Sequence, residues 1–227
     1  MLNSLFRLLL GGSCFLCRDA ARELLCEACR AELPRLGADR CPRCALASPG
    51  GAPCGRCLSR APQFDATRAA LDYRFPADVL VHALKFRGEL ALAPLLGALL
   101  REALGPDSKA DAVLPVPLSD QRLRERGFNQ AMEIARPLAA AAGAPIEPGL
   151  CERTRDTAAQ TRLSLAGRAQ NVRGAFRCPR PLSGGTIAVV DDVMTTGASL
   201  AELARVLRAA GAARVENWVV ARTLPPA

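Results

Sequence analysis

The sequence predicts an α/β fold, a mostly parallel sheet flanked by helices, behind a small cysteine-rich unit. Residues 187–190 form an unbroken apolar and β-branched run, which is typical of a strand buried on both faces of a sheet. Other strand-like runs alternate with longer helical stretches along residues 61–227, as they do in parallel sheets. Four Cys-x-x-Cys pairs lie within residues 14–57. We therefore expect two units, residues 1–60 and residues 61–227.

The composition is that of a globular protein, with 50% hydrophobic and 23% charged residues. The formal net charge is +8, but two four-cysteine zinc sites would remove about four of these charges. The remaining excess is too small to indicate a nucleic-acid-binding protein by itself. Residues 1–10 are apolar, but they are too short to span a membrane and lack a basic leader. We expect a short helix there, no membrane insertion and a cytoplasmic protein.

The cysteine pairs have the spacing of metal ligands. Two residues between the cysteines let both sulfurs reach one tetrahedral ion, and two such pairs complete a four-cysteine site. Sequential pairing predicts two tandem zinc ribbons with structural Zn²⁺, and interleaved pairing is the alternative. A disulfide framework would need an oxidising compartment, and an iron–sulfur cluster is the remaining alternative. The predicted ligands are Cys14, Cys17, Cys26, Cys29, Cys41, Cys44, Cys54 and Cys57.

A linker at residues 59–64 leads into the second unit. Weak alternation over residues 68–73 predicts a strand, and Pro76 suits the first turn of a helix over residues 77–86. A second helix, apolar on all sides, follows over residues 90–104. Lys85 lies near the end of the first helix, where a cation is favourable, so it is either a solvated charge or a phosphate ligand.

The middle of the chain carries two arginine-rich stretches. A buried strand at residues 112–116 is followed by a basic loop and then by a helix over residues 128–142. Residues 152–180 contain seven arginines against two acids and show little hydrophobic periodicity, which indicates a mobile segment. Either stretch has a plainer interpretation, a solvated basic loop or a strip that binds nucleic-acid backbone. Cys151 and Cys178 fall outside the metal spacing, and we expect small core residues there.

The stretch after residues 187–190 has the pattern of a phosphate site. Asp191 and Asp192 follow the strand, then come Thr195–Ser199 and a helix over residues 200–210. Backbone N–H groups at a helix N-terminus favour an anion, and Gly197 allows close approach. The Walker and Rossmann spacings are absent. Carboxylates accept hydrogen bonds from hydroxyls, so the pattern suits a ribose 5-phosphate, although an acidic turn before a capped helix is the plainer alternative.

This pattern resembles the phosphoribosyl pyrophosphate (PRPP) motif of type I phosphoribosyltransferases. Together with the cysteine pairs, the segments LKFRG and PVP…RGFNQA make nearly the whole chain resemble the ComF family, bacterial proteins implicated in DNA uptake. The resemblance implies a double zinc ribbon before a type I phosphoribosyltransferase-like domain that binds PRPP with Mg²⁺. It implies catalytic roles for Asp191, Asp192 and Arg153, and PRPP-binding roles for Thr195, Thr196, Gly197, Ala198, Ser199, Arg126, Asn129, Lys85, Gln160, Arg168 and Asn171.

Fold does not decide chemistry, so three functions stay open. The first is a phosphoribosyltransferase that acts on an unknown acceptor, with residues 152–180 closing over the ligand to exclude water. The second is a factor that binds single-stranded DNA or the competence machinery, and the third is a PRPP-sensing regulator without turnover. The aromatic content of 4% offers few platforms on which single-stranded bases could stack.

Overall fold

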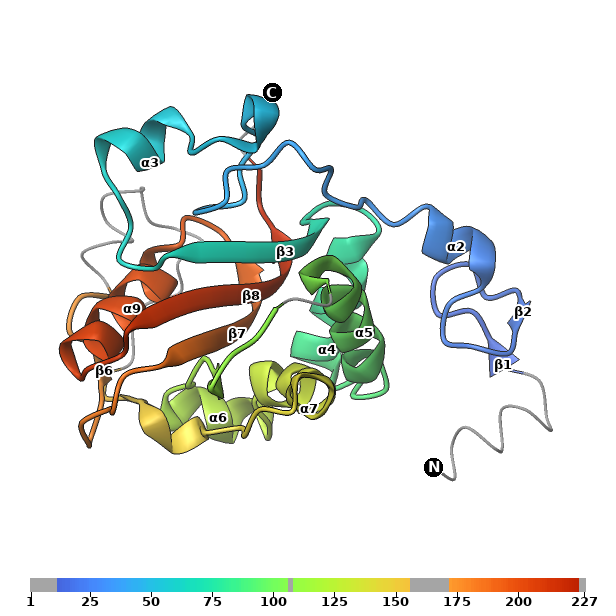
Figure 1. The fold of residues 1–227 in the computed structure, drawn as a ribbon. Helices are drawn as coiled ribbons and strands as arrows, with labels where there is room; N and C mark the ends of the chain where they lie inside the picture. Colours follow the sequence, from blue (N-terminus) through green and yellow to red (C-terminus); the bar gives the residue numbers. More distant parts are fainter. Residues whose placement is uncertain (1–11, 106–107, 156–171, 225–227) are drawn as a thin grey trace.

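A four-stranded sheet forms the centre of the computed structural model, which describes residues 12–105, 108–155 and 172–224 (Figure 1). The strand order is β3-β8-β7-β4, and all neighbours run parallel. The strands are β3 (Ala66–Asp72), β4 (Ala112–Pro115), β7 (Thr186–Met194) and β8 (Arg214–Arg222). The predicted α/β class, with its mostly parallel sheet, is confirmed.

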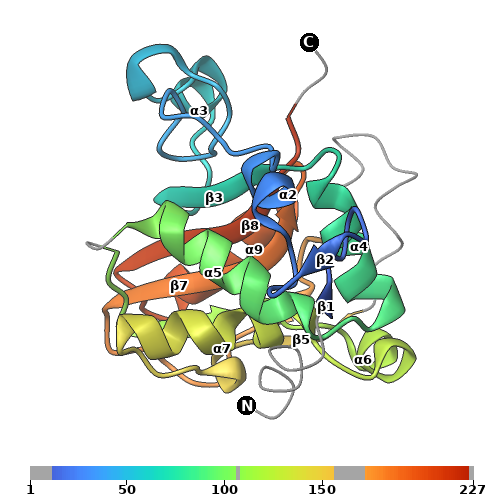
Figure 2. The ribbon, with the colours of Figure 1, turned by 90° about the vertical axis from the view of Figure 1, so that its right-hand side faces the viewer.

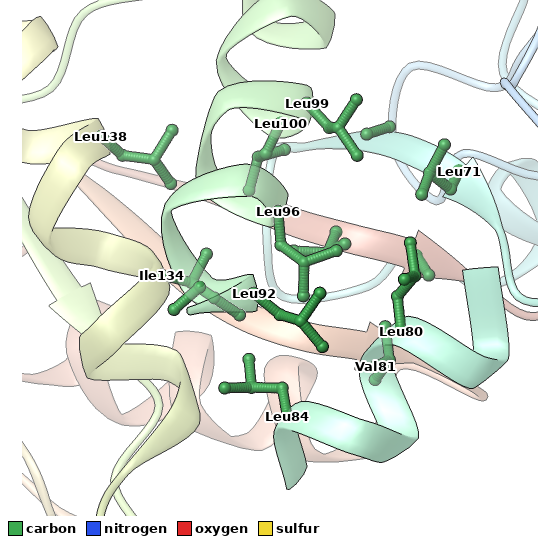
Figure 3. Packing of buried hydrophobic residues seen from close by; sticks show 14 of the residues in the cluster. Leu71, Leu80, Val81, Leu84, Leu92, Leu96, Leu99, Leu100, Ile134 and Leu138 are labelled. Atoms are coloured by element: carbon green, nitrogen blue, oxygen red, sulfur yellow. The ribbon is translucent and has the colours of Figure 1, made fainter. Parts of the chain in front are cut away.

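Helices cover both faces of the sheet (Figures 1 and 2). Three lie on one face, where Leu80, Leu96 and Ile134 are fully buried (Figure 3). The only tryptophan, Trp218, is buried in the same cluster. On the opposite face Leu203 and Leu207 of a fourth helix pack on β7 and β8. These helices are α4 (Ala77–Arg87), α5 (Leu92–Leu104), α7 (Gln130–Ala142) and, on the second face, α9 (Ala198–Ala209).

Two local structures differ from the sequence prediction. Strand β7 continues to Met194, so Asp191 and Asp192 belong to the strand instead of following it. The predicted basic loop contains a helix, α6 (Asp120–Arg126), with a capping residue at each end. The Oγ of Ser119 accepts a hydrogen bond from the N–H of Arg122 at the start, and Gly127 adopts φ 79° at the end.

The cysteine-rich unit consists of short elements on both sides of the sheet. Cys14 belongs to the same buried cluster as residues of α4 and α5, whereas Cys41 and Cys57 belong to the cluster on the face that carries α9. The chain that leads from the first group of cysteines into the second, residues 34–42, runs along the edge strand β3. The elements of the cysteine-rich unit are β1 (Gly12–Ser13), β2 (Ala20–Ala21), α2 (Glu27–Ala31), the 3-10 turn Pro49–Gly51 and α3 (Gly55–Ser59).

Three backbone hydrogen bonds join residues 34–42 to β3. The N–H of Leu36 donates to the carbonyl of Ala70 at 3.2 Å, and the N–H of Thr67 donates to the carbonyl of Pro42 at 3.0 Å. The third runs from the N–H of Asp72 to the carbonyl of Pro34, at 2.8 Å. The predicted units 1–60 and 61–227 therefore share a backbone interface, and the boundary between them stays a prediction.

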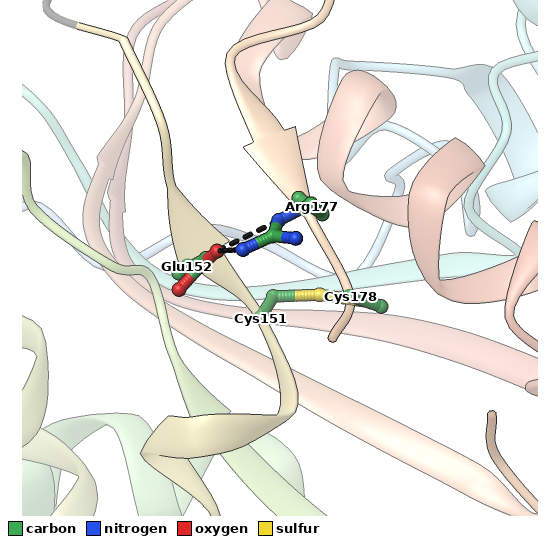
Figure 4. The surroundings of a disulfide bond; sticks show 4 residues. All are labelled: Cys151, Glu152, Arg177 and Cys178. Carbon is green, nitrogen blue, oxygen red and sulfur yellow. Dashed lines mark hydrogen bonds and ion pairs between the residues drawn. A yellow bond between two sulfur atoms is a disulfide. The ribbon is translucent and has the colours of Figure 1, made fainter. Parts of the chain in front are cut away.

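A short hairpin stands at the ends of the arginine-rich segment. Strands β5 (Glu152–Arg153) and β6 (Phe176–Arg177) pair antiparallel after the 3-10 turn Pro148–Leu150. A disulfide joins Cys151 to Cys178 at the base of the hairpin (Figure 4). We expected two separate core cysteines. Cys151 is indeed buried, but the sequence analysis missed the pairing.

No helix within the described residues is long and apolar enough to cross a lipid bilayer.

Helices α5 and α7 touch at a position where only glycine fits. A Cβ atom on Gly97 would lie 2.6 Å from the Cγ of Pro137 and 3.1 Å from the carbonyl oxygen of Ile134. Pro137 lies inside α7, where its rigid ring cannot turn aside. The close approach of these two helices therefore depends on the absence of a side chain at residue 97.

We predict that Gly97→Ala lowers the free energy of unfolding by about 1–2 kcal/mol, because overpacking outweighs the better helix propensity of alanine. Urea unfolding followed by circular dichroism measures it. Gly149→Ala is the matched control, since a Cβ there meets nothing within 4 Å. A Gly97→Ala protein as stable as the wild type would contradict the packing argument.

Candidate functional site

Two adjacent carboxylates occupy the carboxyl end of β7. Asp192 is 2% exposed and Asp191 is partly buried. The Oδ1 of Asp191 accepts a hydrogen bond from the N–H of Asp192, and the Oδ1 of Asp192 accepts one from the N–H of Val193, both at 2.9 Å. Strand β4 ends at Pro115, so β7 extends beyond its neighbour here and its own side chains complete the hydrogen bonding. The carboxyl ends of parallel strands are the usual ligand edge of such sheets.

Lys85 of α4 lies directly against this acidic pair. Its Nζ is 2.8 Å from the Oδ2 of Asp192. Burial by itself lowers the pKa of Lys85, but Asp192 and Asp191 outweigh it and raise that pKa. Burial likewise raises the pKa of Asp192, but Lys85 outweighs it, so the pKa of Asp192 is lowered. Asp191 has its pKa raised well above the ordinary value by burial and by the charge of Asp192. One carboxylate is thus firmly ionised and its neighbour resists ionisation.

Arg126, at the end of α6, adds a second cation to this edge. Burial lowers its pKa, and the carboxylates of Asp192 and Asp191 act in the opposite direction. Its guanidinium lies 5.7 Å from the ring centroid of Phe86 and donates to the Oε1 of Gln130. Phe86 itself is 63% exposed, so Arg126 lies against an exposed aromatic ring.

Asn129 has a structural role at the start of α7. Its Oδ1 accepts from the N–H of Ala131 and its Nδ2 donates to the carbonyl of Val116, both at 3.0 Å. The side chain thus fastens the end of β4 to the helix. A contact between Asn129 and a ligand stays a prediction.

The loop of Thr195–Ser199 leads from β7 into α9. Gly197 adopts φ 81°, a left-handed conformation that favours glycine, and a Cβ there would also have to displace the flexible end of Met194, whose Cε would lie 2.6 Å away. The Oγ1 of Thr196 accepts from the N–H of Ala198 at 3.3 Å. Among the described residues, the backbone N–H groups of Thr195, Thr196 and Gly197 have no acceptor. Unpaired N–H groups at a helix N-terminus suit an anion.

The structure brings together Lys85, Asp191, Asp192 and Arg126, with the loop at the end of the same strand. Arg153 lies on β5, where its guanidinium is 5.5 Å from the ring centroid of Phe176. Its Nε donates to the carbonyl of Arg155 at 3.3 Å. The other predicted ligands in this stretch, Gln160, Arg168 and Asn171, lie outside the described residues.

The sequence analysis missed two arginines beneath the loop. Arg222, the last residue of β8, is 1% exposed and donates to the carbonyl of Met194 at 2.9 Å. Arg56 of α3 donates to the carbonyl of Thr196, also at 2.9 Å. The sequence did contain a signal for Arg222, because this charged residue directly follows the apolar run of β8. A charge in a strand that is buried on both faces of the sheet needs a partner.

The eight cysteines form two clusters in which the sulfurs lie within 4.8 Å of one another. Each cluster consists of two consecutive pairs, so sequential pairing is confirmed and the interleaved alternative is wrong. Burial raises the pKa of Cys14, but backbone N–H groups outweigh it and lower that pKa to about 6, and the same holds for Cys41. The first cluster is Cys14, Cys17, Cys26 and Cys29, and the second cluster is Cys41, Cys44, Cys54 and Cys57.

The comparisons with known proteins agree with these clusters. The double zinc ribbon domain matches residues 5–58, which supports structural zinc at both sites. The DNA utilization protein YhgH of Salmonella typhimurium is 38% identical over 94% of this chain and 98% of its own. Competence protein F of Haemophilus influenzae is 30% identical over 74% of this chain and 78% of its own. The chain belongs to the ComF family.

More distant matches complete the comparison. A further ComF relative, competence protein ComFC of Streptococcus pneumoniae, is 26% identical over 87% of each chain. Among solved structures, the allosteric regulatory enzyme of purine biosynthesis matches 56% of this chain with 26% identity and a TM-score of 0.36. The match covers 25% of that enzyme's chain.

We predict about two zinc atoms per chain in the purified protein, because each cluster completes one tetrahedral four-thiolate site. Elemental analysis measures the content. Cys26→Ser should reduce the content to about one, since only the first cluster loses a ligand. Less than one zinc atom per wild-type chain, or freely reactive thiols in the folded protein, would contradict the assignment.

We predict that Lys85→Met destabilises the protein more at pH 8 than at pH 5. Without the cation, the folded-state pKa of Asp191 rises further above the unfolded value of about 3.9, and that of Asp192, which Lys85 holds below this value, rises through it because burial is no longer opposed. An acid whose pKa is raised on folding binds more protons in the folded state, so stability falls as the pH rises between the two values. Removing one partner of a buried pair should cost about 3 kcal/mol at pH 8, the low end of the usual range, because the side chain of Lys85 is 27% exposed.

Urea unfolding of variant and wild type at both pH values measures this difference, and contributions from the cysteines cancel in the comparison. Lys109→Met is the matched control, because it removes the chain's other lysine from an exposed position. Equal losses at both pH values would mean that Lys85 contributes packing and not charge.

Proposed function

We propose that the protein binds PRPP, or a related ribose 5-phosphate ligand, and acts as a phosphoribosyltransferase linked to DNA uptake. One observation carries the proposal. The acidic pair Asp191 and Asp192 and a loop of unpaired N–H groups lie at the end of one strand, with Lys85 and Arg126 facing the acids. Vicinal hydroxyls and a phosphate on one sugar match these two features.

The charges suggest a role for each group. Asp192 is kept ionised by Lys85, so it accepts hydrogen bonds from the ribose hydroxyls and stabilises positive charge that develops on the sugar. The N–H groups of Thr195, Thr196 and Gly197, with the neighbouring Ala198 and Ser199, receive the 5-phosphate at the start of α9. Arg126 and Lys85, the cations that interact with the two carboxylates, are proposed to receive the pyrophosphate group.

In the proposed reaction a nucleophile attacks the anomeric carbon while the bond from that carbon to pyrophosphate breaks. The electron pair of that bond leaves with pyrophosphate. Carboxylate oxygens suit a hard cation, so Mg²⁺ carried by PRPP fits beside Asp191 and Asp192, where it would neutralise charge on the leaving group. Residues 152–180, with Arg153, Gln160, Arg168 and Asn171, are proposed to close over the ligand and exclude water.

The link to DNA uptake rests on the relatives. Two of them are named competence proteins and one is named a DNA utilization protein. These names also favour a second candidate, a factor without turnover that binds single-stranded DNA or the competence machinery. A PRPP-sensing regulator is the third candidate, since Asp191 and Asp192 could bind the ligand without catalysing transfer. Pyrophosphate release across a panel of acceptors separates the enzyme from the other two.

We predict that Thr196→Asp abolishes measurable PRPP binding while the protein stays folded. Two unit charges about 4 Å apart repel by roughly 4 kcal/mol at an effective dielectric constant near 20. A phosphate dianion doubles this repulsion, and screening by solvent reduces it. Even a quarter of the doubled value weakens binding by more than tenfold. The new carboxylate also lies near the N-terminus of α9, which favours a negative charge in the absence of ligand.

Isothermal calorimetry with PRPP and Mg²⁺ measures the affinity. The control is Ala213→Asp, which adds the same charge at an exposed position directly before β8. This position lies at the amino ends of the strands, away from the carboxyl ends that carry the candidate site. Undiminished affinity in Thr196→Asp would mean that the phosphate binds elsewhere. Wild-type protein with full zinc content that binds single-stranded DNA but no PRPP would favour the second candidate.

A further inference from the structure

The guanidinium of Arg222 joins the second cluster to the loop of Thr195–Ser199. Its Nε donates to the carbonyl of Cys44 at 2.8 Å. Its Nη1 donates to the carbonyls of Met194 and Thr195, and to that of Thr223 at 2.8 Å. Arg222 therefore holds a zinc ligand and the start of the loop with one planar group, and both ends of this connection are buried.

Arg56 makes a second connection between the second cluster and the loop, from an exposed position. It lies on α3 between Cys54 and Cys57, and its Nη2 donates to the carbonyl of Thr196. The carbonyls of three successive residues, Met194, Thr195 and Thr196, thus point toward arginines anchored beside the second cluster.

Peptide geometry gives these contacts a consequence for the ligand side of the loop. In a trans peptide the C=O and the following N–H point in opposite directions. Three carbonyls held toward the second cluster therefore direct the next three N–H groups away from it. These are the N–H groups of Thr195, Thr196 and Gly197, which have no acceptor among the described residues. The arginines thus orient the donors that an anion requires.

Charge balance explains why arginines occupy these two positions. A four-thiolate site that holds Zn²⁺ carries a net charge of about −2. Arg222 has no carboxylate partner within the described residues, so the second cluster supplies the opposite charge. The two arginines together match the charge of the loaded site.

The first cluster provides a natural comparison. Its surroundings lie on the other face of the sheet, where Arg30 and Arg35 form ion pairs with Glu102 of α5. Cys14 is buried in the cluster that contains residues of α4 and α5. Within the described residues, no hydrogen bond or ion pair joins this cluster to residues 195–198.

We propose that the second cluster, when it holds zinc, positions the phosphate loop through Arg222 and Arg56, so that ligand affinity depends on metal in the second cluster and not in the first. The identity of the ligand rests on the proposed function. Arg222 and Arg56 are positioning residues, since they face the back of the loop and direct its N–H groups.

The first test uses Arg56, because its side chain is exposed and its replacement should leave folding intact. Arg56→Ala should weaken PRPP affinity by about three- to tenfold, as expected for one lost hydrogen bond from a charged donor at an exposed site. Amide hydrogen exchange at residues 195–197 should accelerate while zinc content stays unchanged. Arg56→Lys should restore most of the affinity, because a single donor reaches a single carbonyl. Arg60→Ala, an exposed change in the same region, should alter neither readout.

The second test compares the clusters. Cys54→Ser and Cys26→Ser should each lose one zinc atom, but only Cys54→Ser should accelerate exchange at residues 195–197 and weaken PRPP affinity more than tenfold. Exchange in α5 and α7 reports whether the sheet domain stays folded. Equal effects of the two substitutions, or an unchanged loop in both Cys54→Ser and Arg56→Ala, would overturn the proposal. The exchange measurements need no ligand, so they decide it even if wild-type protein binds no PRPP.

Discussion

The ion pair between Lys85 and Asp192 is the interaction on which the candidate site depends. A carboxylate that is 2% exposed is costly to ionise, and a second carboxylate beside it raises the cost. The pair is tolerable because α4 brings an ammonium group to 2.8 Å from Asp192. This requirement constrains how α4 packs on β7, and with it the core residues Leu80 and Leu84 that hold α4 in place.

Both edges of the four-stranded sheet are covered by irregular chain. Residues 34–42 hydrogen-bond to β3 on one side. On the other side the N–H of Val113 in β4 donates to the carbonyl of Pro145, and the N–H of Glu147 donates back to the carbonyl of Val113, each at 2.9 Å. An uncovered edge strand invites pairing with another chain. The cysteine-rich unit therefore does more than hold metal, because the chain that leads from its first cluster into its second protects β3.

Features with short-range signatures were predictable from the sequence. The cysteine spacing predicted both clusters, and the apolar run before Asp191 predicted β7 and the loop into α9. Long-range contacts were not predictable in this way. Arg222 and Cys44 are 178 residues apart, and no local pattern relates them. Helix α6 is a different kind of miss, since its Ser119 cap and Gly127 end were visible, but its arginines were interpreted as a loop. The disulfide between Cys151 and Cys178 depends on a hairpin that only the fold reveals.

The position of Trp218 has a practical consequence for optical work on this protein. It is the only indole in the chain, it lies in β8 at the centre of the sheet, and it is fully buried. Its emission should shift to longer wavelength only when the sheet opens to water. Tryptophan fluorescence therefore reports the integrity of the sheet and of the core around Trp218, a core that includes Cys14 of the first cluster but none of the cysteines of the second. For the second cluster, the chain thus carries its own probe for separating loss of metal from loss of fold.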